Sequence, residues 1–270
     1  LTSIYIPASV TTIESNGFRD CTALEKVITP SIAAWCGISF PGNNATSNPL
    51  NYAHHLYVGS KESNSEVTDL VVPTGIEEIK ALAFYGFTAM TSLSLPETVK
   101  KIDNYAFYGS TGLTEVTLPE GFEELGHYVF DGSTSLASMV LPSTLTKIGY
   151  YSFMNVPLLT DVYCNADPST LSWQNNGSQF IADKGTYFHV AHPSAWIATF
   201  PDANVTYIGE LTLSENDDNS EVLEENDGLL CNVQLTRTLR SGSYNTFAVP
   251  FDVSSEQLES VLGEGVKVKE

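Results

Sequence analysis

Hydrophobic positions recur along the chain with a fixed spacing of 23 residues. The same interval separates successive members of three independent columns: Pro73, Pro96, Pro119 and Pro142; Phe84, Phe107, Phe130 and Phe153; and Ile79, Ile102, Leu125 and Ile148. A period in the twenties with aliphatic residues at constant offsets is typical of a solenoid, in which each repeat forms one coil and neighbouring coils share a core.

Each repeat contains signals for two short strands. The pattern L-x-x-L-x-L-P predicts a first strand that ends at the proline, because proline cannot donate to a parallel ladder. A second apolar pair, such as Val99 and Ile102, then returns inward before an A-F-x-G corner. We therefore expect a mainly β solenoid with parallel ladders about 4.8 Å between strands. The expected repeats begin at Leu1, Leu24, Val67, Met90, Leu113, Leu136 and Leu159.

The spacing also predicts the domain organisation. The solenoid is expected over 1–210, with a 20-residue insertion near 31–62 and an end cap at 160–210. Within the cap, the sequence favours a strand, a short helix from Pro193 to Phe200 and another strand, which would cover the open solenoid end. An acidic linker is expected at 211–228. The start of a β-rich domain, with a helix near 254–262, is expected at 229–270.

The first repeat, LTSIYIPASVTTIESNGFRDC, resembles the BspA-like leucine-rich repeats of bacterial surface and secreted proteins. The resemblance covers about 1–165, with Gly17 in place of the usual alanine and the family's cysteine kept only at Cys21. It implies a leucine-rich-repeat fold and a non-enzymatic, cell-surface or secreted protein that binds other proteins. The segment from 229 resembles a module that often follows these repeats.

Composition and charge narrow the function. The chain has 42% hydrophobic residues, and 12 basic against 32 acidic residues give it a net charge of −20. Such a charge repels polyanions, which argues against a nucleic-acid partner. No apolar run is long enough to span a membrane, and the first residues lack the pattern of a signal peptide. We expect a fragment or a mature piece whose export signal has been removed.

Candidate metal and redox sites have structural explanations. Cys21, Cys36, Cys164 and Cys231 are far apart, which favours isolated, mostly buried thiols over a zinc site. His54 and His55 are adjacent, so on an extended segment they point to opposite faces and cannot easily share one ion. The acidic stretch 214–228 lacks the spacing of a calcium loop. No metal, cofactor or catalytic residue is predicted.

Two surfaces are candidates for binding. The first is the outward side of the first strands, which most solenoids use for recognition. The second is the column of tyrosines before the A-F corner, which could bind a partner or could simply stack along the solenoid. The candidate residues are Tyr5, Val71, Ser94, Thr117, Val140, Tyr163, Tyr105, Tyr128 and Tyr151. The pairs Glu77-Glu78, Lys100-Lys101, Glu123-Glu124 and Thr146-Lys147 predict ion-pair ladders on the second strands.

These observations leave two hypotheses for the function. The first is an adhesion-type protein at the bacterial cell surface or outside the cell, whose partner is an extracellular host or microbial protein. The second is a carbohydrate-binding protein associated with glycan capture, or, less in keeping with the sequence, a carboxylate glycoside hydrolase. The lysines that alternate with the glutamates argue against the hydrolase, since they prevent an isolated acid pair with a raised pKa.

Overall fold

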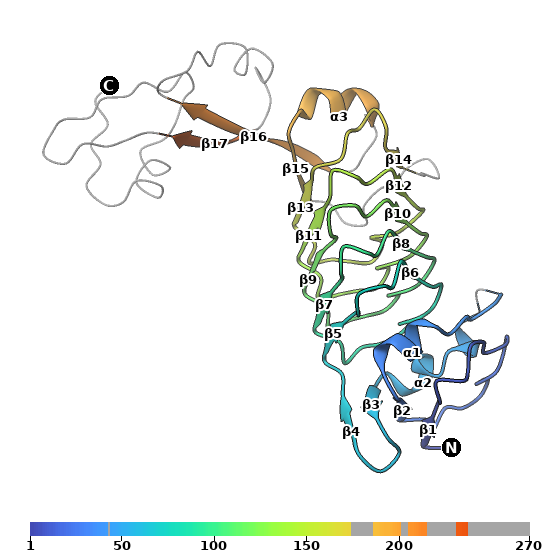
Figure 1. The fold of residues 1–270 in the computed structure, drawn as a ribbon. Coiled ribbons are helices and arrows are strands. Elements are labelled where there is room, and N and C mark those ends of the chain that lie inside the picture. The colour runs from blue at the N-terminus through green and yellow to red at the C-terminus, as the bar shows by residue number, and fades with distance from the viewer. Residues whose placement is uncertain (43, 174–185, 201–204, 215–230, 237–270) are drawn as a thin grey trace, which may run out of the picture.

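The computed structural model describes residues 1–42, 44–173, 186–200, 205–214 and 231–236. Their coils stack into one elongated solenoid, with a ladder of strands along one side and short second strands along another (Figure 1). The helices of the insertion lie near the N-terminal end, and helix α3 (Pro193–Thr199) lies at the other end of the stack. The expected leucine-rich solenoid is confirmed.

The first strands of the coils form three consecutive groups. β1, β2 and β3 pair in parallel, β5 pairs with β7, and the series from β9 to β17 pairs in parallel through β11, β13, β15 and β16. Partners in neighbouring regular coils are 23 residues apart, as in Ser138 and Asp161. The strands span Ser3–Tyr5, Lys26–Thr29, Leu56–Gly59, Asp69–Val71, Ser92–Ser94, Glu115–Thr117, Ser138–Leu141, Asp161–Cys164, Tyr187–Val190, Thr206–Ser214 and Cys231–Thr236.

The second strands form their own parallel ladder in the order β14, β12, β10, β8 and β6. They span Ser172–Trp173, Lys147–Ile148, Glu124–Leu125, Lys101–Ile102 and Glu78–Ile79. Each is only two residues long, because the chain bends into the corner directly afterwards. One residue of every pair is buried and the other faces outward.

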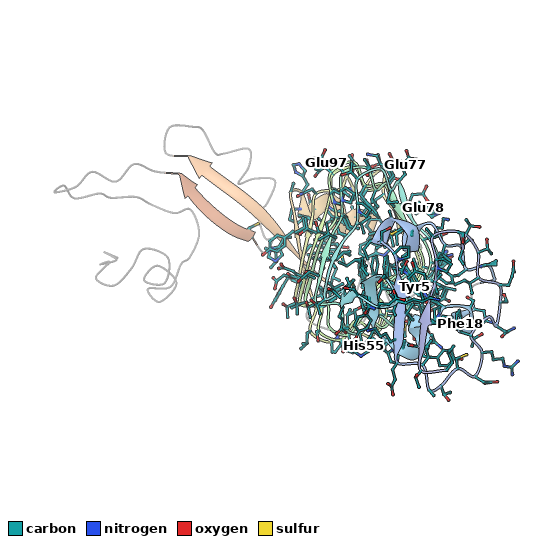
Figure 2. All side chains as sticks on the ribbon, turned by 60° about the horizontal axis from the view of Figure 1, so that its bottom comes forward. Tyr5, Phe18, His55, Glu77, Glu78 and Glu97 are labelled. Atoms are coloured by element: carbon teal, nitrogen blue, oxygen red, sulfur yellow. The ribbon has the colours of Figure 1, made fainter. Side chains whose placement is uncertain are left out.

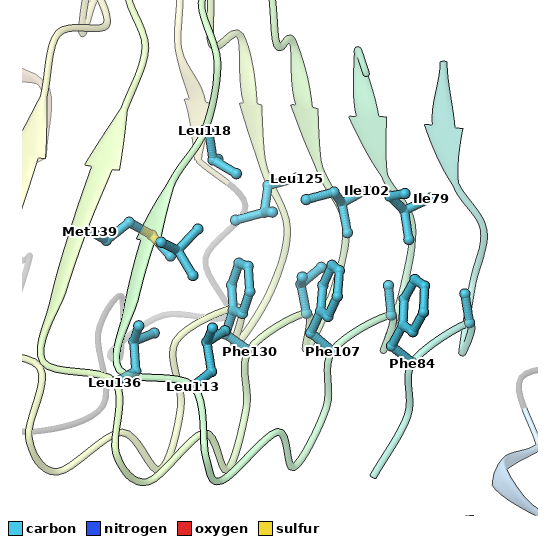
Figure 3. Packing of buried hydrophobic residues seen from close by; sticks show 14 of the residues in the cluster. Ile79, Phe84, Ile102, Phe107, Leu113, Leu118, Leu125, Phe130, Leu136 and Met139 are labelled. Atoms are coloured by element: carbon cyan, nitrogen blue, oxygen red, sulfur yellow. The ribbon is translucent and has the colours of Figure 1, made fainter. Parts of the chain in front are cut away.

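The hydrophobic columns seen in the sequence form the core. Ile79, Ile102 and Leu125 lie one above another in successive coils, and Phe84, Phe107 and Phe130 form a second column beside them (Figure 3). These side chains are fully buried. The rings of Phe107 and Phe84 are nearly parallel with centroids 5.3 Å apart, and those of Phe107 and Phe130 are 5.6 Å apart. One cluster of buried residues continues from Ile6 to Tyr207.

The insertion connects the first coils to the regular stack. It forms α1 (Ile32–Cys36), the 3₁₀ helix η1 (Ala45–Ser47) and α2 (Leu50–Ala53), and β4 (Asn64–Glu66) then pairs antiparallel with β3. The fully buried Trp35 donates from Nε1 to the carbonyl of Ala83 at 2.8 Å. Asn48 donates to the carbonyl of Leu82 at 2.6 Å. Regular coils satisfy such carbonyls with backbone amides of the neighbouring coil.

The C-terminal end shows the expected order of strand, helix and strand. Trp196 of α3 is buried against the rings of Phe188, Phe200 and Tyr207. β16 continues to Ser214, past residue 210, and pairs with β17. The rest of the expected linker and the helix near 254–262 lie outside the described residues. No helix in the described part of the chain is long and apolar enough to cross a membrane.

One expected outward position is wrong. Ile28, in the middle of β2, was expected on the solvent side of the first strands, but it is only 6% exposed. Its partners in register are Tyr5 on one side and Tyr57 on the other. Two large rings therefore flank a short aliphatic side chain and cover it.

Candidate functional site

The outward side of β5 to β13 forms a flat surface of two parallel rows, which we call the strand face. Its first row contains Val71, Ser94, Thr117, Val140 and Tyr163. Val71 is 61% exposed and Tyr163 is 43% exposed, whereas Val140 is half-buried. The middle of this row has small side chains, so a partner could approach the backbone closely.

The second row of the strand face alternates carboxylates with serines. Its members are Asp69, Ser92, Glu115, Ser138 and Asp161. Ser92 donates from Oγ to Asp69 Oδ1 at 2.6 Å, and both side chains are exposed. Glu115 is also exposed, and the described part of the chain offers neither Glu115 nor Asp69 a basic partner within ion-pair distance.

Polar contacts mark both ends of the strand face. At the C-terminal end, His189 Nε2 donates to Asp161 Oδ1 at 2.8 Å, and this bond lowers the pKa of Asp161. The imidazole also stacks on Tyr163 with centroids 4.3 Å apart. Toward the N-terminus, Lys26 Nζ lies 3.9 Å from the centroid of the Tyr57 ring. Tyr5, the remaining candidate on this side, is half-buried, and Lys61 Nζ lies 5.6 Å from its ring centroid.

The second candidate surface is a flank of stacked rings beside the A-F corner, which we call the tyrosine flank. Tyr105 and Tyr128 have centroids 4.8 Å apart with planes within 4°, and Tyr128 and Tyr151 are 5.2 Å apart. Two shorter rows lie alongside, Tyr85 with Tyr108 and His127 with Tyr150. All seven side chains are half-buried.

Backbone geometry positions these tyrosines. Tyr105, Tyr128 and Tyr151 have φ values of 58°, 55° and 54°, in the left-handed region that bulky residues seldom adopt. The first coil has Asn16 at the same place, with φ 64°. The corner thus needs a left-handed residue in every coil, whichever side chain it carries. The sequence gave no sign of this conformation, because asparagine or glycine is the usual signal for it.

Partial burial changes the titration of groups in the tyrosine flank. Burial raises the pKa of Tyr85 to about 12, and the nearby Tyr108 and Asp131 add to the shift. Burial also lowers the pKa of His127, assisted by Lys147. Asp131 takes the place of a third ring after Tyr85 and Tyr108, and burial raises its pKa. The flank is therefore uncharged at neutral pH except for this one carboxyl group.

The second strands carry the expected alternation of charge. Lys101 Nζ lies 2.8 Å from Glu78 Oε1, and Lys147 Nζ lies 3.6 Å from Glu124 Oε2. The bond with Glu78 raises the pKa of Lys101. Figure 2 shows Glu77, Glu78 and Glu97 together on one side of the molecule, away from His55. This surface is self-complementary, which favours a structural role over a ligand site.

The histidines and cysteines occupy structural positions. His54 Nδ1 donates to the carbonyl of Gly86 at 2.8 Å, and His55 Nδ1 bonds to Glu66. Cys36 and Cys164 are buried thiols whose pKa values burial raises to about 12. Among the described residues, no group of three or more histidine, cysteine, aspartate or glutamate side chains is placed to hold a metal ion.

The fold and its repeated surfaces define a leucine-rich-repeat solenoid, and comparison with known families identifies it further. The BspA-type leucine-rich repeat region matches residues 1–47 and 62–174 in six copies. This match spans more than half of the chain. The protein belongs to the BspA-type leucine-rich repeat family.

Solved structures of other bacterial repeat proteins are similar at low identity. The pneumococcal vaccine antigen PcpA has 14% identity and a TM-score of 0.48, over 77% of this chain and 68% of its own. The Treponema pallidum (T. pallidum) leucine-rich repeat protein has 16% identity and a TM-score of 0.34, over 77% and 69%. A leucine-rich repeat protein from Eubacterium ventriosum has 15% identity and a TM-score of 0.43, over 79% and 50%. Among curated proteins, none matches this sequence.

Proposed function

We propose that this protein is a non-enzymatic, adhesion-type repeat protein at the bacterial cell surface or outside the cell, and that it binds an extracellular protein. Membership of the BspA-type family supports a protein-binding scaffold. Two solvent-facing surfaces repeat along the stack, the strand face and the tyrosine flank. An extended protein partner can contact several coils of either surface at once, and such repetition suits recognition over a large area.

The observation that carries this proposal is the arrangement of the rings in the tyrosine flank. Tyr105, Tyr128 and Tyr151 stack on one another, so their inner faces are already occupied. They offer ring edges and hydroxyl groups to a partner. A sugar binds aromatic residues mainly through the ring face, whereas protein interfaces use tyrosine as an amphipathic contact with both apolar and hydrogen-bonding parts.

The charged groups support a role without catalysis. Glu78 and Glu124 have Lys101 between them in register. Its ammonium group keeps both carboxylates ionised, which leaves no proton donor of the kind that glycoside hydrolysis needs. Asp161 and His189 form a hydrogen-bonded pair, but His189 is only 7% exposed and stacks on Tyr163.

Glycan binding is the second candidate, and one observation favours it. Tyr163 and Tyr187 are exposed to 43% and 42% at the C-terminal end of the strand side. Exposed rings of this kind suit contact with the apolar faces of sugars. A glycan site here would be separate from the tyrosine flank.

The test is a binding screen of the full chain against extracellular-matrix proteins and glycans side by side. The matched variant replaces Tyr105, Tyr128 and Tyr151 with asparagine, the residue that the first coil carries at this position as Asn16. Asparagine tolerates the left-handed backbone, so the variant removes the rings without straining the corner. A second variant, Glu77→Gln with Glu123→Gln, alters an exposed surface elsewhere.

Saturable binding to a protein supports the proposal, and its loss in the asparagine variant alone would assign the contact to the tyrosine flank. Binding only to glycans would favour the second candidate. Failure to bind any protein in the screen would contradict the proposed function.

A further inference from the structure

We propose that the strand face binds an extended, cationic protein segment in the polyproline II conformation, with a basic side chain at every third position. This inference rests on the proposed protein-binding function and names the chemistry of the partner. It starts from an unpartnered sheet face that combines exposed apolar side chains with carboxylates at regular intervals.

The carboxylates of the strand face recur on every second coil. Asp69 pairs with Ser92, and Glu115 and Asp161 lie on either side of Ser138. Neighbouring strands lie about 4.8 Å apart, so carboxylates on alternate coils are separated by about 9.6 Å along the solenoid. The apolar side chains of the adjoining row, Val71 and Val140, lie beside them.

A polyproline II segment has the matching period. It advances about 3.1 Å per residue with three residues per turn, so every third side chain points the same way at intervals of about 9.3 Å. Over the two intervals from Asp69 to Asp161, the mismatch with about 9.6 Å spacing adds up to only about 0.6 Å. Flexible lysine or arginine side chains absorb a difference of this size.

Other regular conformations fit less well. An extended β segment repeats each face after two residues, about 6.8 Å, and so misses the interval between carboxylates. An α-helix returns to the same face after seven residues, about 10.5 Å, which leaves a mismatch of about 1.8 Å over two intervals. A helix is also about 10–12 Å wide, so its backbone could not approach the small side chains of Ser94 and Thr117 closely.

Two of the three carboxylates are available for such a partner. Asp69 and Glu115 are exposed, and neither has a basic partner within ion-pair distance in the described part of the chain. Asp161 already accepts from His189, so it contributes less. Prolines of the segment would pack on the exposed side chains of Val71 and Tyr163.

The charge of the whole molecule favours the same partner. A net charge of −20 attracts cationic segments over long range and speeds their association. Long-range attraction alone would not depend on where the basic residues stand in the segment. Dependence on their spacing is therefore the property that distinguishes a specific site from general attraction.

The test measures binding of fluorescent synthetic peptides to the full chain by anisotropy. One peptide repeats the triplet Pro-Pro-Lys, and a second has the same composition with its lysines grouped together at one end. The protein variants are Asp69→Asn with Glu115→Gln on the strand face, and Glu77→Gln with Glu123→Gln on the second strands as the matched control. Both variants remove two exposed carboxylates and change the net charge equally.

We expect the triplet peptide to bind saturably and the grouped peptide to bind about tenfold more weakly. The strand-face variant should weaken binding of the triplet peptide about tenfold, in line with the loss of two exposed charge pairs, and the control variant should change it little. Equal binding of the two peptides, equal loss in the two variants, or no binding at all would overturn the inference. Capture of a protein in the screen together with any of these results would leave the proposed function standing.

Discussion

At the residue scale, the tyrosine flank combines a strained backbone with favourable ring stacking. A bulky residue in the left-handed region costs about 1–2 kcal/mol, and three consecutive coils place a tyrosine there. Stacked aromatic pairs return about 0.5–1.5 kcal/mol each beyond the area they bury. The two contributions are of similar size, so stability alone does not require tyrosine at these positions.

The left-handed backbone gives a prediction for Tyr128. Tyr128→Gly and Tyr128→Ala both remove the ring, but only glycine adopts φ near 55° without a steric penalty. The glycine variant should therefore be about 1 kcal/mol more stable than the alanine variant, whereas in ordinary helix or strand positions glycine is the less stable. Urea unfolding of the two variants measures the difference. An alanine variant of greater stability would contradict the backbone assignment.

Asp131 gives a prediction for the dependence of stability on pH. Burial raises the pKa of its carboxyl group in the folded protein, so the ionised form costs stability at neutral pH, and that cost disappears as the pH falls through the raised pKa. Asp131→Asn keeps a group that can accept from Asn155 and removes the charge. The variant should be more stable than the parent at pH 7, with the advantage shrinking in acid.

Thermal unfolding of the Asp131→Asn variant and its parent across this pH range provides the measurement. Asp167→Asn is a suitable control, since Asp167 is an exposed carboxylate whose pKa is lowered by its bonds to Ser169. An advantage of Asp131→Asn that grows in acid would contradict the account.

At the element scale, the insertion depends on polar groups that fix it to the regular stack. Trp35 donates to the carbonyl of Ala83 from a fully buried position. Trp35→Phe removes that donor, leaves the carbonyl less satisfied and opens space beside the smaller ring. We expect a loss of about 1–3 kcal/mol in the free energy of unfolding. Tyr52→Phe, which removes a hydroxyl that accepts from the amide of Asp20 at an exposed site, should cost much less.

Equal costs of Trp35→Phe and Tyr52→Phe in chemical denaturation would mean that the bond from Trp35 does not hold the insertion in place. The connection itself was not predictable from the sequence. The words W-C-x-I-x-F and N-P-L marked the insertion as unusual, but only the folded chain brings Trp35 and Asn48 to the carbonyls of a coil more than thirty residues away.

The charged row on the second strands gives another prediction at this scale. Lys101 lies between Glu78 and Glu124, so Lys101→Glu replaces attraction by repulsion on both sides. Because these side chains are partly exposed, we expect a loss of only about 1 kcal/mol at low salt, which shrinks as salt is added. Lys100→Glu on the same coil is the control, since it should have a smaller effect. A loss that does not depend on salt would contradict the ladder.

At the scale of the whole molecule, the repeat is what made the fold predictable. A 23-residue period fixes which residues of neighbouring coils are in register, and Glu78, Lys101 and Glu124 meet as the arithmetic requires. The same period placed Val71, Ser94, Thr117, Val140 and Tyr163 in one row and the three tyrosines in another.

Positions that depend on contacts outside the period were less predictable. Ile28 is buried because two rings from neighbouring strands cover it, and one of them, Tyr57, comes from the insertion. The hydrogen bond between Asp161 and His189 joins a regular coil to the end of the stack, where the period has already failed. Sequence repetition therefore predicts the regular coils well and their two ends poorly.

The core also has a consequence for the whole molecule. Buried residues form one continuous cluster from Ile6 to Tyr207, although each coil touches only its neighbours. A defect in the middle of the stack should therefore weaken both ends. The chain has three tryptophans, of which Trp35 lies in the insertion and Trp173 and Trp196 lie near the C-terminal end, so fluorescence can follow the two ends separately.

Every surface described above depends on the register of the coils, and urea unfolding of Phe107→Ala tests that register most directly. Phe107 is fully buried between Phe84 and Phe130. The account predicts a loss of about 3–5 kcal/mol, with the fluorescence transitions of Trp35 and of Trp173 with Trp196 both moving to lower urea. An unchanged unfolding midpoint at both ends would contradict the stacked core and, with it, the assignment of the strand face and the tyrosine flank.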